Sequence, residues 1–132
     1  MPDPIDPIKA NEPEWFLLAP EQYAAARPLF YALEHHLFIT ALMEGTITGA
    51  IYVDSPLQPR AGLIAYHNAL CLAGDPTSPG FNAALRQFLM QAVIPPRLEA
   101  GWEAFVVHYS PAGWLEALAP ICAPYRVIQR TR

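Results

Sequence analysis

The chain has 132 residues and a formal net charge of −4, and 53% of its residues are hydrophobic while only 15% are charged. This length suits one domain, and the apolar content excludes intrinsic disorder in spite of 15 prolines. The shortage of basic residues argues against nucleic-acid binding, and no apolar run is long enough to cross a membrane. Because no export signal is visible, we expect a cytoplasmic protein in which Cys71 and Cys122 are buried, reduced thiols.

Hydrophobic periodicity and the positions of the prolines predict the elements along the chain. Residues 1–13 hold four prolines and three acidic residues, and we expect them to form a flexible tail. Residues 14–132 then form a single domain. In chain order, the first expected elements are a strand over 15–18, helices over 20–27 and 28–35, and strands over 37–43, over 46–54 and from 61 to about 67 or 72. A helix then begins at Pro79 and stops at Pro95, and a strand follows over 104–109. The last two expected elements are a helix that begins at Ser110-Pro111 and stops at Pro120, and a strand over 125–129.

The resulting order of elements is β-α-α-β-β-β-α-β-α-β. An antiparallel meander followed by alternating helices and strands is typical of a mixed sheet. The sequence therefore predicts an α/β (α+β) fold with helices on both faces of that sheet.

This order resembles the GNAT (N-acetyltransferase) superfamily, whose fold has a first strand, two helices, an antiparallel meander, a long helix, a strand, a helix and a final hairpin. The resemblance covers residues 15–132 and lacks only the last strand. More narrowly, Gly49-Ala50-Ile51-Tyr52-Val53-Asp54, Leu72-Ala73-Gly74-Asp75 and Trp114 resemble the divergent N-terminal domain of bacterial GNAT-type acetyltransferase proteins. A sheet without its last strand has an exposed edge. The resemblance thus implies a partner there, either a second GNAT-like domain or another copy of the chain.

The loop before the long helix decides how much of the superfamily's chemistry is expected. In active members it reads Gln/Arg-x-x-Gly-x-Gly/Ala, and its amides bind the pyrophosphate of acetyl-CoA at the helix N-terminus. Here Gly74 and Gly80 flank a segment in which Pro76 and Pro79 lack amide donors and Asp75 adds a negative charge. This pattern implies a degenerate phosphate loop (Gly74, Asp75, Gly80). We expect no bound cofactor, or acetyl-CoA if the protein is active.

A candidate ligand pocket consists of polar residues near strand ends, because ligands of open α/β sheets favour the carboxyl ends of strands. Its members are His67, Asn68, Asp75, His108 and Tyr109. The competing explanation is that these side chains satisfy nearby backbone groups. His67, Asp75 and His108 lack a short-range metal-ligand spacing, so no metal site is predicted.

The resemblance assigns no catalytic residue. The tyrosine that active members carry in the late helix falls near Ala117 here, so a general acid is also missing. Three functions remain open. The first is a non-catalytic or degenerate N-terminal domain of an acetyltransferase, with a packing or substrate-side role. The second is an acetyl-CoA-dependent N-acetyltransferase in its own right, and the third is a small-ligand or regulatory binding module.

Overall fold

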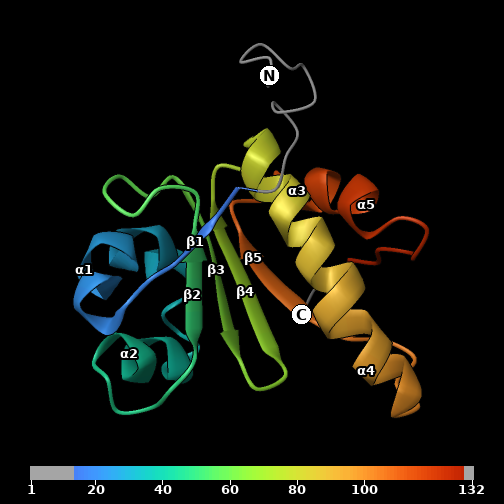
Figure 1. Cartoon of the computed structure of the whole chain (residues 1–132), viewed down its shortest axis with the longest axis horizontal. Helices are drawn as coiled ribbons and strands as arrows, with labels where there is room; N and C mark the ends of the chain where they lie inside the picture. Colours follow the sequence, from blue (N-terminus) through green and yellow to red (C-terminus); the bar gives the residue numbers. More distant parts are fainter. Residues whose placement is uncertain (1–13, 130–132) are drawn as a thin grey trace, which may run out of the picture.

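A five-stranded mixed sheet lies at the centre of the protein (Figure 1). The computed structural model describes residues 14–129, so the predicted tail over 1–13 lies outside the described residues. The strands are hydrogen-bonded in chain order, with the first three pairs antiparallel and the last pair parallel. They are β1 (Phe16–Leu17), β2 (Ala50–Val53), β3 (Ala61–Tyr66), β4 (Ala69–Gly74) and β5 (Val107–Ser110).

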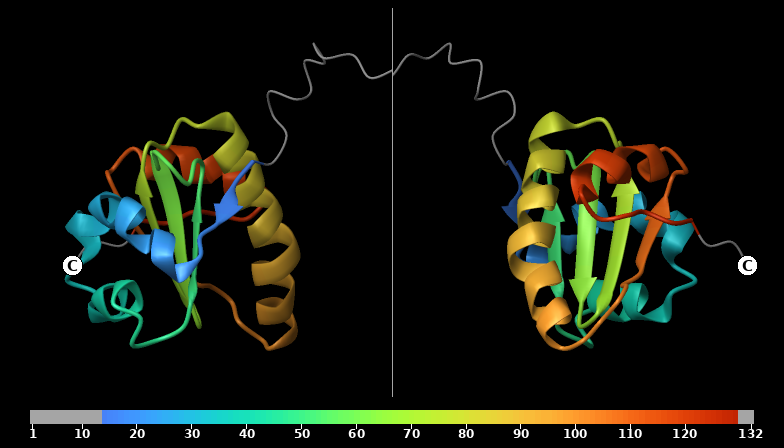
Figure 2. Two further views of the ribbon diagram at one scale, coloured as in Figure 1. Left: turned by 60° about the vertical axis from the view of Figure 1, so that its left-hand side comes forward. Right: turned by 90° about the vertical axis from the view of Figure 1, so that its right-hand side faces the viewer.

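Helices cover both faces of the sheet, as the two views of Figure 2 show. One face carries the short helices η2 (Pro20–Gln22), α1 (Tyr23–Ala26), η3 (Arg27–Leu33) and α2 (Leu37–Met43). The other face carries α3 (Pro79–Phe88), the π-helical turn η4 (Leu89–Val93), α4 (Ile94–Glu99) and α5 (Trp114–Cys122). The predicted fold class, an α/β chain with a mixed sheet between helices, is confirmed.

The alternation of side chains along β4 builds a separate core on each face of the sheet. Leu70 and Leu72 belong to the cluster under α3 and α5. Cys71 and Ala73 belong to the cluster under the N-terminal helices. Successive residues of a strand point to opposite faces, so one apolar strand contributes to both cores.

Cys71 and Cys122 are both buried and free, as predicted. They lie in different clusters, which the sheet separates. Burial raises the pKa of the Cys71 thiol to about 12 and raises that of Cys122 as well, although the Arg86 charge opposes the latter shift. Neither thiol is therefore a ready nucleophile.

The predicted strand over 37–43 is wrong, because these residues form helix α2. Ile39 and Leu42, three residues apart, are fully buried on one helical face, whereas Leu37 is 82% exposed. In a seven-residue run with six apolar residues, periodicity alone does not separate a strand from a helix. The three-stranded meander exists, but it consists of β2, β3 and β4, and β2 is shorter than the predicted strand over 46–54. A turn at His67 and Asn68 divides the run that follows residue 61 into β3 and β4.

Two of the predicted helix stops are also wrong. Pro95 lies in the first turn of α4, directly after η4, so the helical axis continues to Glu99. Proline is tolerated in a first turn, and a π-helical turn changes the hydrogen-bond register before it. Pro120 lies inside α5. The Arg86 guanidinium donates to the carbonyls of Pro120, Ile121 and Ala123 at 3.1, 2.8 and 2.7 Å, and so satisfies the end of this helix.

The end of the chain differs from the prediction in two places. Ser110 pairs with Ala73 as the last residue of β5, so it does not cap the next helix, and α5 begins after Gly113. Residues 125–129 form no strand. This segment lies beside α4, α5 and β5, where its apolar side chains line a cavity, and its backbone pairs with no strand.

Candidate functional site

The segment that joins β4 to α3, residues 75–78, is folded on itself. The Asp75 carboxylate accepts hydrogen bonds from the Thr77 amide at 2.9 Å and from the Thr77 hydroxyl at 2.6 Å. These two bonds, the hydroxyl first, lower the pKa of Asp75. The Thr77 amide therefore already has an anionic acceptor.

Few amides of this segment are left for a ligand. Pro76 and Pro79 have no amide hydrogen. The Asp75 amide donates to the carbonyl of Arg60 at 2.7 Å. Together with the bonded Thr77 amide, four of the six positions from 75 to 80 offer no free donor, which leaves Ser78 and Gly80. An anion-binding nest needs several convergent amides.

Two contacts fix this segment against the rest of the fold. Gly74 has φ +91, and a Cβ there would lie 2.8 Å from the carbonyl carbon of Arg60. The indole Nε1 of Trp114, a fully buried residue of α5, donates to the Gly74 carbonyl at 3.1 Å. The end of β4 is thereby held between β3 and α5.

The five residues of the predicted ligand pocket are not brought together. His67 and Asn68 form the turn before β4, and Asp75 follows its other end. A six-residue strand spans on the order of 20 Å. His108 pairs with Cys71 and Tyr109 with Leu72, so their side chains point to opposite faces of the sheet.

His108 and Tyr109 consequently have different neighbours. The His108 ring lies 4.1 Å from the His36 ring, centroid to centroid, on the side of the N-terminal helices. Tyr109 lines a cavity on the side of α5. Nor do His67, Asp75 and His108 meet, and within residues 14–129 no group of three or more His, Cys, Asp or Glu side chains is placed to hold a metal ion.

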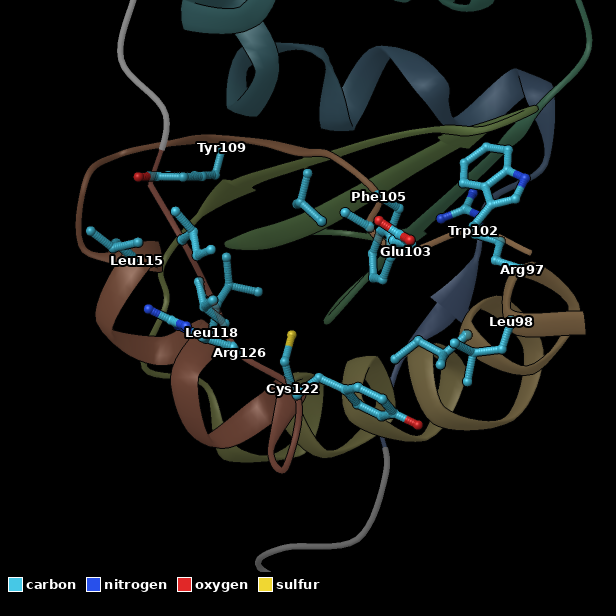
Figure 3. Close-up of a pocket in the computed structure, with 16 residues that line it drawn as sticks. Arg97, Leu98, Trp102, Glu103, Phe105, Tyr109, Leu115, Leu118, Cys122 and Arg126 are labelled. Atoms are coloured by element: carbon cyan, nitrogen blue, oxygen red, sulfur yellow. The ribbon is translucent and has the colours of Figure 1, made fainter. Parts of the chain in front are cut away.

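Two cavities lie on the face of α4, and the sequence did not indicate the smaller one, which lies between α4 and α5, as a site. The first, of about 330 Å³, is enclosed by α4, α5, β5 and the segment 125–128 (Figure 3). The second, of about 380 Å³, adjoins the turn between β3 and β4, where His67 and Asn68 line it. Arg97 and Trp102 line both cavities.

Arg97 is the unusual side chain of this region. Its guanidinium lies over the ring of Trp102 at 5.2 Å and over that of Phe105 at 5.0 Å. Its Nη2 donates to the carbonyl of Asn68 at 3.4 Å, and its Nη1 is buried without a hydrogen-bond partner. The available signal in the sequence was a lone arginine followed by two aromatic residues within eight positions.

Comparisons with known proteins assign no function. No protein-family model matches the chain, and no curated protein matches it. Among residues 14–129, no helix has the length and apolar character needed to cross a membrane.

Proposed function

We propose that this chain is a non-catalytic GNAT-like domain, which serves an acetyltransferase through packing or substrate-side contacts and does not bind acetyl-CoA. The observation that carries this proposal lies in the segment between β4 and α3, where the Asp75 carboxylate accepts a hydrogen bond from the Thr77 amide. The divergent N-terminal domain of bacterial GNAT-type acetyltransferases, which the sequence resembles, has the corresponding role.

The order of the elements supports the GNAT-like part of the proposal. The resemblance implies an antiparallel meander, a long helix, a further strand and a second helix, in that order. Strands β2, β3 and β4 are antiparallel neighbours, α3 follows them, β5 pairs in parallel with β4, and α5 comes next. The helices between β1 and β2 also occupy the position that the resemblance implies.

Electrostatics at the start of α3 support the loss of cofactor binding. A pyrophosphate would gain from the positive end of the helix dipole and from free amides. To reach the Thr77 amide, it would have to displace the Asp75 carboxylate, which holds two hydrogen bonds. The displaced carboxylate would remain next to the added phosphates, and like charges at short range repel.

The residues of α5 support the loss of catalysis. The expected place of the general acid is near Ala117, and α5 reads Trp-Leu-Glu-Ala-Leu-Ala-Pro-Ile-Cys, without a tyrosine. Cys122, the thiol of this helix, is buried, and burial raises its pKa. Neither the Ala117 side chain nor the buried Cys122 thiol suits proton transfer to a leaving thiolate at neutral pH.

The free edge of β5 is the expected docking surface for the partner, a second GNAT-like domain or another copy. Within residues 14–129, β5 is the last strand of the sheet. Exposed apolar side chains lie near it, with Val106 at 57% and Ile128 at 69% exposure. Edge strands with apolar neighbours are seldom left uncovered.

Thermal unfolding with increasing acetyl-CoA tests the proposal. A ligand that binds the folded state raises the melting temperature as its concentration grows. We expect no rise at acetyl-CoA concentrations that saturate an active GNAT enzyme measured in parallel. A concentration-dependent rise would overturn the proposal in favour of an acetyltransferase in its own right. Light scattering tests the docking surface, because a copy bound at β5 makes the measured mass depend on concentration.

A further inference from the structure

The guanidinium of Arg97 is a cation for which residues 14–129 supply no anionic partner. Within residues 14–129, the ion pair that forms is Arg27 with Glu34, on the other face of the sheet. Arg97 makes one long hydrogen bond, to the Asn68 carbonyl, and its Nη1 is buried without an acceptor. Burial also lowers the pKa of this guanidinium, which nevertheless remains charged.

Such a buried donor is costly unless an acceptor arrives. The rings of Trp102 and Phe105 hold the guanidinium plane, so little side-chain entropy is lost when a ligand binds it. A fixed guanidinium matches a carboxylate with two parallel hydrogen bonds. This site is separate from the segment between β4 and α3, and its ligand is independent of the proposed GNAT-like role.

The cavity beside Arg97 indicates the rest of the ligand. Its volume of about 330 Å³ lies within the range of small-molecule sites. Its walls are mainly apolar and include Val107, Leu118 and Cys122 (Figure 3). An apolar cavity with one fixed cation favours a ligand with an apolar body and one anionic group.

The charges around the cavity favour a single negative charge on that ligand. Arg97 and Arg126 are the cations that line it, and Glu103 is the anion. Glu103 is exposed and forms no ion pair with Arg97. Two cations and one anion give the lining a net charge of +1, which a monoanion neutralises, whereas a phosphate dianion would leave an excess negative charge beside Glu103.

We propose that this cavity binds a small monocarboxylate with an apolar chain, whose carboxylate pairs with Arg97 and whose chain lies among Val107, Leu118 and Cys122. No covalent step is involved. The site selects the acid over the matching alcohol, and it tightens as the chain lengthens until the cavity is full.

Isothermal titration calorimetry with sodium octanoate and 1-octanol tests the proposal on the full chain. We expect octanoate to bind with a Kd below about 1 mM and octanol to bind at least about tenfold more weakly, because the alcohol leaves the guanidinium unpaired. Hexanoate should bind more weakly than octanoate, by up to about fourfold for each methylene removed.

Four variants separate the carboxylate site from general effects. Arg97→Met should weaken octanoate binding at least about tenfold and leave octanol binding unchanged, whereas Arg27→Met, the same change on the other face, should alter neither. Val107→Phe should fill the cavity and weaken both ligands. Val106→Phe, at an exposed neighbour that does not line the cavity, should weaken neither. Circular dichroism establishes that each variant is folded.

Three results would overturn the proposal. The first is equal affinity for octanoate and octanol, which removes the role of Arg97. The second is octanoate binding that Arg97→Met leaves unchanged. The third is no measurable octanoate binding. If the measured mass of that chain also doubles with concentration while the Val107→Phe variant stays monomeric, the cavity belongs to an interface between copies.

Discussion

The indole of Trp114 connects α5 to the end of β4, and Trp114→Phe removes that connection while keeping an aromatic ring. The side chain is fully buried, and its Nε1 donates to the Gly74 carbonyl at 3.1 Å. The change deletes two buried ring carbons, worth about 1.6 kcal/mol. It also leaves the carbonyl unsatisfied, at about 1–3 kcal/mol. We therefore expect the free energy of unfolding to fall by about 2.6–4.6 kcal/mol.

Urea unfolding followed by circular dichroism measures this loss, and Trp102→Phe is the matched control. Trp102 is 38% exposed, and the phenyl ring that replaces it still faces Arg97. The control should cost less than about 1 kcal/mol. If Trp114→Phe costs no more than Trp102→Phe, the hydrogen bond to Gly74 does not hold α5 against the sheet, and the reasoning fails.

Three further predictions use the same assays. Gly74→Ala should lower the free energy of unfolding by at least about 1 kcal/mol more than Gly45→Ala in urea unfolding. Both glycines have positive φ, but only at Gly74 would the added Cβ clash with backbone atoms of β3 and the residue before it. Equal losses for the two variants would contradict this close contact. At pH 8, Cys71 should resist iodoacetamide in the folded protein and react after unfolding, since burial raises the pKa of its thiol to about 12. Mass spectrometry of the peptide that contains Cys71 measures the extent of labelling, and rapid labelling of the folded protein would contradict the prediction. Because the pKa of Asp75 is lowered from 3.8 in the folded state, chiefly by the Thr77 hydroxyl, its contribution to stability is present above pH 4 and is lost as the pH falls through the folded pKa. Asp75→Asn should remove that part of the acid sensitivity, and an unchanged pH dependence of the urea midpoint would be contrary evidence.

The sequence predicted the elements whose pattern is strong over a long segment. The stripe of α3, with Phe81 and Leu85 buried, has helical periodicity and a proline in the first turn. The order of elements also predicted a strand near residues 104–109, and this strand, β5, pairs in parallel with β4. In contrast, six of the seven residues 37–43 are apolar, and only the packing of Ile39 and Leu42 against the sheet decides for a helix.

The missed features depend on contacts between distant parts of the chain. Pro120 stays within α5 because Arg86, 34 residues earlier, binds the carbonyls at the end of that helix. No local signal contains such a contact. The signal for the predicted degenerate phosphate loop was local, because two prolines and an aspartate lie within the seven residues 74–80.

The candidate pocket failed for a related reason. Its five residues were placed at the ends of predicted strands, and the strand that begins at residue 61 was predicted to end at about 67 or 72, without a further strand after a turn. Once 61–72 became two strands, His67 and Asn68 moved to the opposite end of β4 from Asp75. Arg97 was not singled out, because its burial depends on rings that follow it after a turn.

The central claim is that the Asp75 carboxylate closes the segment between β4 and α3 to a pyrophosphate. An amide-resolved NMR titration with acetyl-CoA tests it most directly, with the Thr77 amide as the reporter. The account predicts that the Thr77 and Gly80 amide signals stay in place over the whole titration. Saturable shifts of both signals, at concentrations that saturate an active GNAT enzyme, would contradict it.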